Sequence, residues 1–207
     1  AIISAAKTIK IKIPPPSIRL LSSRLARLWR LQFRPSFAWV THSSPFFLPP
    51  ESLCLHLRRV KLSAAEIRDA VKLALAEDIG SGDVTTLATV PQDATARAVM
   101  RAREPLVVAG LAFADQAFQE LSASIKIDRA AKDGGRFKDG DSLLNVSGPA
   151  HAILSAERVA LNFVQWLSGI ATLTAQFVDA VKDTGAQILD TRKTTPGWRR
   201  FEKYAVV

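Results

Sequence analysis

Apolar residues recur at helical spacing soon after Ser63, and they predict the first helix of the folded part of the chain. Ser63 is a good N-cap, and Glu66 stands three residues later, which is the capping-box spacing. Gly80 and Gly82 provide the stop signal. The apolar positions that define the buried face are Ile67, Ala70, Val71, Ala74 and Leu75.

Two further stretches show the same periodicity. Residues 111–121 predict a second helix. A long helix is expected from about residue 148 to 167, with Ser147 as its cap and a proline in its first turn. Ser168-Gly169 is expected to interrupt this helix, and residues 171–182 predict another one after the interruption.

Alternating or short apolar runs predict four strands, at residues 94–103, 124–130, 142–146 and 187–189. The last of these is a short apolar strand that leads directly into Asp190-Thr191-Arg192-Lys193.

The first 61 residues differ from the rest in composition. They contain seven of the eleven prolines and a net charge of +10, whereas residues 62–207 sum to −1. A uniformly basic nucleic-acid-binding domain is therefore excluded for residues 62–207. The leader is Arg-rich, Ser-rich and acid-poor, and its spacing predicts an amphipathic helix over residues 17–34. This composition is typical of an organellar transit peptide. A disordered or wrongly included upstream extension, or a nucleic-acid-binding tail, is the alternative.

Composition excludes several kinds of site. Cys54 is the only cysteine, so no intrachain disulfide can form. The three histidines show no metal-ligand spacing, and no uncharged run approaches the ~20 residues of a membrane helix. Met100 is the only methionine, so we expect a fragment, a processed form or an imperfectly bounded reading frame.

The residues with the clearest chemistry are Thr191, Arg192 and Lys193, at the carboxyl end of the predicted strand 187–189. Ligands bind at that end in α/β sheets and barrels. Arginine offers a planar fork to carboxylate or phosphate, lysine a movable point charge and threonine a neutral hydroxyl. The trio suits a polyanionic small molecule, and a solvated basic turn is the alternative.

Two charged residues lie in the middle of the long predicted helix. Glu157 falls among the apolar positions, where an unpaired carboxylate would be costly, so it needs a cationic partner or faces a site or subunit boundary. Arg158 is either simply exposed or paired with a carboxylate. Asp78 and Asp83 could bind a metal, although a polar turn is the simpler interpretation, and we expect His151 to be structural.

Three motifs in order resemble the quinolinate phosphoribosyltransferase family (nicotinate-nucleotide pyrophosphorylase, carboxylating). The first runs from Glu77 to Thr86 (EDIGSGDVTT). The second is Glu157 to Asn162 (ERVALN) followed by LSGIAT over 167–172. The third is LDTRKTTPG over 189–197 with EKYAV over 202–206. The resemblance spans about residues 64–206, and no part of it lies in the leader.

The resemblance implies an enzyme of NAD biosynthesis with an α/β fold. An α+β N-terminal domain, residues 62–168, would be followed by the start of an incomplete α/β barrel, residues 169–207, after the leader of residues 1–61. The implied reaction converts quinolinate and phosphoribosyl pyrophosphate (PRPP), with Mg²⁺ as cofactor, to nicotinate mononucleotide, pyrophosphate and CO₂. Compared with the family, the chain is C-terminally truncated, so we expect residues 1–207 to be inactive alone.

By position in the motifs, Arg192 and Lys193 would line the anion site, and Thr191 would add a contact. Arg158 would enter the partner's site in a homodimer or larger homo-oligomer with a shared active site, and Glu157 would support it from behind. No catalytic residue, metal ligand, membrane or nucleic-acid partner is assigned. The alternatives are a pyrophosphorylase-like paralogue of molybdate transport and a non-catalytic dimerisation domain. We expect a cytoplasmic protein, or a plastid or mitochondrial one if the leader is a transit peptide.

Overall fold

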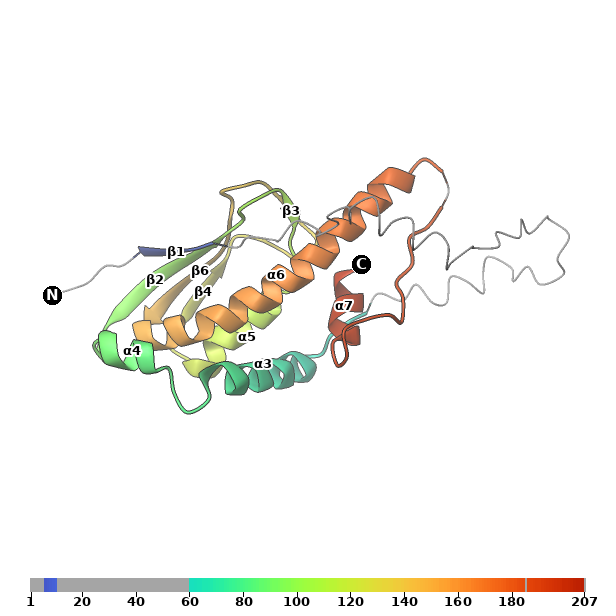
Figure 1. Cartoon of the computed structure of the whole chain (residues 1–207). Helices are drawn as coiled ribbons and strands as arrows, with labels where there is room; N and C mark the ends of the chain where they lie inside the picture. The colour runs from blue at the N-terminus through green and yellow to red at the C-terminus, as the bar shows by residue number, and fades with distance from the viewer. Residues whose placement is uncertain (1–5, 11–59, 185, 207) are drawn as a thin grey trace, which may run out of the picture. The chain divides into compact units, whose positions relative to one another are not determined.

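A computed structural model describes residues 6–10, 60–184 and 186–206 of the chain. The amphipathic helix expected over residues 17–34 lies outside these described residues, as does Cys54. Five helices and six strands are described, and they form a mixed α and β fold (Figure 1).

Helix α3 (Ala64–Ile79) begins as its sequence predicts. The Ser63 side chain accepts a hydrogen bond from the Glu66 backbone, and the Glu66 carboxylate accepts one from the Ser63 backbone, which completes the capping box. Gly80 ends the helix with a positive φ of 52°. A short helix, α4 (Val84–Thr89), follows directly and is capped by Asp83.

The main sheet has the strand order β1-β2-β6-β4. Strand β1 (Ala6–Lys10) is parallel to β2 (Thr95–Arg101), and the pairs β2–β6 and β4–β6 are antiparallel. The two remaining members of the sheet are β4 (Lys126–Arg129) and β6 (Ser142–Pro149). A separate two-stranded ribbon joins β3 (Leu106–Val107) to β5 (Arg136–Phe137).

Helix α6 (Ala150–Val181) is one continuous helix of 32 residues that packs against β2, β6 and α5 (Leu111–Leu121) (Figure 1). The core lies between these elements, and its largest fully buried side chains include Phe113, Phe118, Met100, Leu144 and Leu167. Gly110, just before α5, is required by close packing, since a Cβ there would stand 2.8 Å from Leu167 Cδ1 and its φ is 93°.

Two predictions about α6 are wrong. Ser147 does not cap the helix, because β6 continues through residues 147–149 and Pro149 occupies the N-cap position. Ser168-Gly169 does not interrupt it either. The Ser168 hydroxyl is fully buried and exchanges hydrogen bonds with the backbone of Ala109, and Thr172 accepts one from Val107 N. These contacts hold the edge of β3 on the helix, and they outweigh the weak local helix preference of serine and glycine.

The last described helix is α7 (Arg199–Ala205), which packs against α6. Four aromatic rings join the two helices to α5. Phe163 stacks on Phe113 and Trp198 with ring centroids 4.6 and 5.0 Å apart, and Phe201 meets Phe113 and Trp198 edge to face. This cluster fixes α7 to the core.

Candidate active site

The segment that carries Thr191, Arg192 and Lys193 lies between α6 and α7. We call residues 190–195 the cationic loop. The strand predicted at residues 187–189 is absent, since this stretch has no regular structure and Leu189 is 52% exposed. A strand needs a neighbour to receive its backbone hydrogen bonds, and no described strand pairs with these residues.

Side chains of α7 hold the cationic loop at several points. Lys203 Nζ lies 2.5 Å from Asp190 Oδ1 at the start of the loop. At its end, the Thr195 amide donates to Glu202 Oε2 over 3.2 Å. In the middle, Arg199 donates to Thr194 Oγ1 over 3.2 Å and to the Arg192 carbonyl over 3.3 Å.

The loop also has one internal contact, in which the Lys193 amide donates to Thr191 Oγ1 over 2.8 Å. In contrast, the side chains of Arg192 and Lys193 are exposed, and no carboxylate in the described part of the chain pairs with them. The loop therefore combines a backbone held by neighbours with two cations that are available to an external anion.

Arg158 lies elsewhere on α6, and its guanidinium faces the turn between α3 and α4. Its Nε lies 3.1 and 3.0 Å from the two carboxylate oxygens of Asp78, and its NH2 lies 3.8 Å from Asp83 Oδ2. The hydrogen bond to Asp78 and the nearby negative charges raise the pKa of Arg158 above its ordinary value. The side chain is still 51% exposed.

Asp83 organises the turn that receives Arg158. Its carboxylate accepts from the Thr86 amide and hydroxyl and from Ser155 on α6, and these hydrogen bonds, Thr86 first, lower its pKa. Asp78 and Asp83 are thus occupied by Arg158 and by helix capping. No group of three or more His, Cys, Asp or Glu side chains in the described residues could hold a metal ion.

The two candidate groups are far apart within one chain. Arg158 contacts Asp78 at the C-terminal end of α3, whereas α7 contacts the same helix near its start through an ion pair between Arg200 and Glu66 (Figure 1). Twelve residues of helix separate Glu66 from Asp78, which is ~18 Å at 1.5 Å per residue. The described contacts therefore place Arg158 and α7, which holds the cationic loop, toward opposite ends of α3.

Glu157 precedes Arg158 and is half-buried, and its negative charge contributes to the raised pKa of Arg158. Its supporting role behind Arg158 stays a prediction. His151 Nε2 lies 2.8 Å from the Val90 carbonyl, a contact between α6 and the residue after α4.

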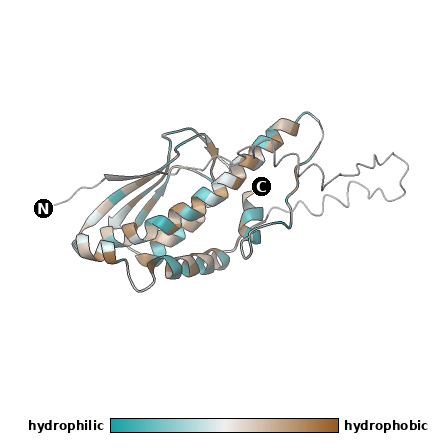
Figure 2. Cartoon of the chain, viewed as in Figure 1, coloured by the Kyte–Doolittle hydropathy of each residue, from teal (hydrophilic) through white to brown (hydrophobic). Residues whose placement is uncertain are grey.

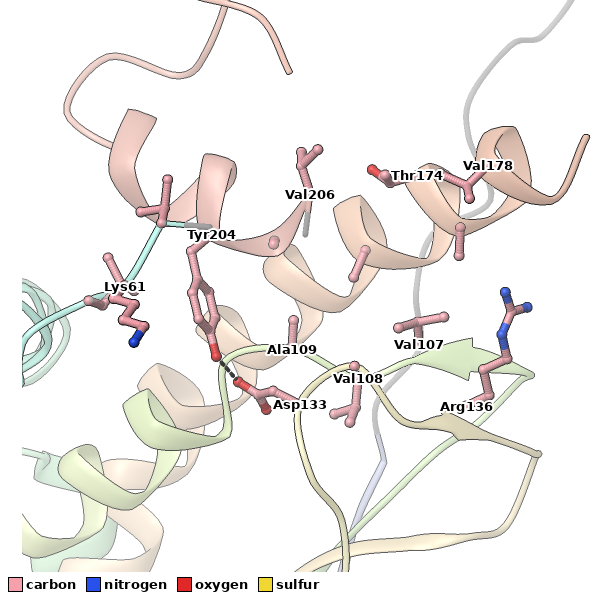
Figure 3. A pocket seen from close by; sticks show the side chains of 16 residues that line it. Lys61, Val107, Val108, Ala109, Asp133, Arg136, Thr174, Val178, Tyr204 and Val206 are labelled. Carbon is pink, nitrogen blue, oxygen red and sulfur yellow. Dashed lines mark hydrogen bonds between the residues drawn. The ribbon is translucent and has the colours of Figure 1, made fainter. Parts of the chain in front are cut away.

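A cavity of about 600 Å³ lies between β3, the C-terminal half of α6 and the end of α7 (Figure 3). Val107, Ala109, Thr174 and Val178 form part of its wall. None of the predicted site residues lines it.

One wall of this cavity contains a contact that the sequence did not reveal. The Tyr204 hydroxyl donates to Asp133 Oδ2 over 2.6 Å, as the dashed line in Figure 3 marks. The same carboxylate accepts from the amides of Gly110 and Leu111 and so caps α5. Burial and the hydrogen bond to Asp133 raise the pKa of Tyr204. In the sequence, the EKYAV stretch of the third motif, which includes Tyr204, was the available clue to this contact.

Sequence models of both domains of one family match the chain. The model of the quinolinate phosphoribosyl transferase N-terminal domain matches residues 83–168, and that of the C-terminal domain matches residues 170–207. The chain belongs to the quinolinate phosphoribosyltransferase family. The two matches meet inside α6, at the Ser168-Gly169 pair.

The family relatives include plant and bacterial proteins. The chloroplastic nicotinate-nucleotide pyrophosphorylase (carboxylating) of Arabidopsis thaliana is 48% identical over 143 residues, which cover 69% of this chain and 40% of the relative. The nicotinate-nucleotide pyrophosphorylase (carboxylating) of Mycobacterium leprae is 44% identical over a stretch that covers 67% of this chain and 50% of the relative. The chain thus spans about half the length, or less, of these relatives.

Solved structures show the same fold. A nicotinate-nucleotide pyrophosphorylase from Francisella tularensis superposes with a TM-score of 0.68 at 34% identity and covers 72% of this chain and 53% of that one. NadC from Streptococcus pyogenes gives 0.68 at 42% identity over 70% and 52%. These matches confirm the predicted α/β class.

The match to one relative reaches into the leader. The chloroplastic protein of Oryza sativa subsp. japonica is 39% identical over 209 aligned positions that cover 94% of this chain and 54% of the relative. Because residues 62–207 make up less than 94% of the chain, this alignment includes part of the leader. The prediction that no part of the resemblance lies in the leader is therefore wrong.

Among the helices that the structure describes, none has the length and hydropathy needed to cross a bilayer.

Proposed function

We propose that the protein containing this chain transfers a phosphoribosyl group from PRPP to quinolinate and releases pyrophosphate and CO₂, which gives nicotinate mononucleotide. Membership of the family supports this reaction, and the cationic loop is the single structural observation that carries it. Arg192 and Lys193 are exposed, adjacent and without a carboxylate partner in the described residues. A polyanion such as a sugar pyrophosphate is the ligand such a pair suits.

The residues fit the demands of this chemistry. Departure of pyrophosphate leaves positive charge on the sugar, and the ring nitrogen of quinolinate needs positioning more than activation. Cationic side chains beside the pyrophosphate favour its departure, because they stabilise the negative charge that develops on it. Thr191 contributes a hydroxyl at the same loop, and its oxygen is also the acceptor for the Lys193 amide.

Mg²⁺ would accompany the pyrophosphate of PRPP and help to neutralise it. The described residues do not fit a protein-held metal site, because they contain no cluster of metal-binding side chains and both carboxylates near Arg158 are occupied. We therefore assign no metal ligand among the described residues.

The active site would be shared between two copies of the protein. The separation of two contacts along α3 supports this arrangement. Arg158 contacts Asp78 near the end of α3, whereas α7, which holds the cationic loop, contacts Glu66 near its start. Arg158 of one subunit would bind a quinolinate carboxylate beside the cationic loop of the other. Three apolar side chains on the C-terminal half of α6 are exposed, which also favours pairing; they are Leu173, Phe177 and Val178. Figure 2 shows hydrophobic, brown segments along α6.

The reaction is tested with the protein at the full length of its relatives. Incubation with quinolinate, PRPP and Mg²⁺ should give nicotinate mononucleotide, detected by mass spectrometry, and omission of quinolinate should give none. Arg192→Ala should reduce product formation strongly, whereas the matched control Lys126→Ala, which removes an exposed cation from β4, should not. Absence of product from the unmodified protein would refute the proposal.

We also propose that the leader directs the protein to a plastid or mitochondrion. Its basic, acid-poor composition supports this, as does the alignment that extends into it from a relative named chloroplastic. A relative from Nicotiana tabacum is named mitochondrial. Residues 1–61 fused to a fluorescent protein should be imported by isolated organelles of one of the two kinds, and a fusion that stays outside both would return the assignment to the cytoplasm.

A further inference from the structure

Glu202 and Lys203, at the end of the third motif, are not among the predicted substrate contacts, yet both side chains contact the cationic loop. We propose that Glu202 and Lys203 are positioning residues, which fix the two ends of the cationic loop so that Arg192 and Lys193 meet the pyrophosphate of the donor at a set spacing. This inference rests on the proposed function and extends it from the residues that bind to those that hold them.

The geometry of Glu202 carries the first part of the proposal. One carboxylate oxygen accepts from the Thr195 amide at the end of the loop, over 3.2 Å. The other accepts from the indole Nε1–H of Trp166 on α6, over 3.1 Å. Glu202 therefore ties the loop to the long helix of the core through a single side chain, and a carboxylate acceptor makes both bonds stronger than neutral ones.

Lys203 acts at the other end of the loop. Its ammonium lies 2.5 Å from Asp190 Oδ1, and the two side chains are only 26% and 33% exposed. The pair has a second effect, which concerns charge. Asp190 is two residues from Arg192, and an unpaired carboxylate there would compete with an incoming anion for the loop cations. Lys203 removes that competition.

The anchor for these contacts is α7 itself, which is held to the core independently. Trp198 and Phe201 pack in the aromatic cluster, Arg200 pairs with Glu66 and Tyr204 bonds to Asp133. Glu202 and Lys203 thus project from a fixed helix. A loop held in this way loses less conformational freedom when it binds an anion, so preorganisation favours affinity.

The direct test is made on the 207-residue chain by NMR. Loss of an acceptor oxygen in Glu202→Gln should shift the Trp166 indole signal and speed hydrogen exchange at the Thr195 amide. Lys203→Met keeps the apolar stem and removes the charge, so it should increase fast motion at residues 190–192. Lys72→Met, which breaks a surface ion pair with Glu120 of α5, is the matched control and should change neither. Unchanged loop signals in both test variants would overturn the proposal.

The kinetic test uses the protein at the full length of its relatives. Lys203→Met and Glu202→Gln should raise the KM for PRPP by about threefold to tenfold while kcat changes less, because the loop still contains its cations. Lys203→Arg should retain most of the wild-type KM. The exchanged pair Asp190→Lys with Lys203→Asp should recover part of what Lys203→Met loses. A fall in kcat alone, with KM unchanged, would show a merely structural role and overturn the proposal.

Failure of the proposed function and failure of the positioning role give different results. If the unmodified full-length protein makes no nicotinate mononucleotide, the proposed function is refuted, and the NMR result still decides whether Glu202 and Lys203 hold the loop. If the protein is active and the NMR signals of the loop do not respond to either variant, only the positioning role is refuted.

Discussion

The Nε of Arg158 lies 3.0 Å from Oδ2 of Asp78, so the second motif of the sequence binds the first across eighty residues. Asp83 adds a second negative charge at 3.8 Å. Two carboxylates therefore hold one side of the Arg158 guanidinium, and the side chain is still half-exposed. A side chain held in this way can present its remaining N–H groups to a carboxylate of a ligand or of a partner subunit.

Replacement of this arginine should affect one substrate selectively. In the full-length protein, Arg158→Ala should raise the KM for quinolinate by about 10- to 100-fold, which is the loss of one charged hydrogen bond of about 1.5–3 kcal/mol. The KM for PRPP should change little. Initial rates measured against each substrate in turn check this, and an equal change in both constants would contradict the assigned role.

The carboxylates behind Arg158 should matter less than the arginine itself. Asp78→Asn keeps the shape of the side chain but removes the charge, so we expect a KM increase for quinolinate that is smaller than that of Arg158→Ala. Thermal unfolding of both variants controls for folding. Asp78→Asn should not exceed Arg158→Ala in its effect on KM.

Mixed oligomers test whether one site takes residues from two chains. At a quinolinate concentration near the wild-type KM, Arg158→Ala and Arg192→Ala subunits are each expected to have little activity. When they are unfolded together and refolded, some sites should receive an intact Arg158 from one chain and an intact Arg192 from the other. Recovered activity, relative to each variant refolded alone, checks the shared site, and no recovery means that both residues belong to one chain.

The ion pair between Arg200 and Glu66 should make stability depend on acid pH. Hydrogen bonds from Arg200 and from Ser63 lower the pKa of Glu66 from 4.5 to about 2. Because the pKa of Glu66 is lower in the folded state than in the unfolded chain, its ionised carboxylate stabilises the folded state at pH values above about 4.5. This contribution is lost as pH falls from about 4.5 to about 2.

Urea unfolding over this pH range measures the effect. Glu66→Gln should be less stable than the wild type at pH 6, and the difference should shrink through the window and vanish near pH 2. The difference in stability between the wild type and Arg200→Gln should also shrink as pH falls, but it should be smaller at pH 6, because Ser63 still donates to the Glu66 carboxylate in this variant. A difference that persists unchanged to pH 2 would contradict the assignment.

Asp133 should contribute more to stability than its hydrogen bond to Tyr204 alone. Asp133→Ala removes the cap of α5, which Gly110 cannot supply, and leaves two amides and a hydroxyl without their acceptor. We expect a loss of about 2–4 kcal/mol in the free energy of unfolding. Tyr204→Phe keeps the cap and should cost about 0.5–1.5 kcal/mol. Chemical denaturation of both variants compares them, and an equal loss would argue against the capping role.

A polypeptide restricted to residues 1–207 should form no nicotinate mononucleotide. The C-terminal domain model matches only residues 170–207, and in the described part of this stretch no strand is formed. An assay of this polypeptide beside a reaction without protein checks the expectation. Product above that background would show that the matched residues are sufficient for catalysis.

Local signals in the sequence predicted the elements that local forces determine. The capping box of Ser63 and Glu66 placed the start of α3, and the apolar spacing of residues 111–121 gave the bounds of α5. The motifs identified the family. Each of these rests on contacts between residues that are near in sequence, or on a pattern of side chains that needs no partner to be recognised.

The failures occurred where a distant segment decides the local structure. Ser168-Gly169 stays helical because β3 docks on it, and residues 187–189 lack a strand because no neighbour pairs with them. The cap of α5 comes from Asp133, more than twenty positions away. For the site, the sequence predicted which residues have the chemistry, but the supports Glu202 and Lys203 became visible only with α7 in place.

The continuity of α6 also restricts how the protein can move. The sequence models divide the chain at residues 168–170, where a hinge between domains would be the usual expectation. Helix α6 runs without a break from Ala150 to Val181, and a sharp bend at that boundary would break backbone hydrogen bonds and the contacts of Ser168 with Ala109. We therefore expect any movement of the cationic loop to occur in the segment after Val181 and in α7. Such a movement would act on the hydrogen bond between Trp166 of α6 and Glu202 of α7.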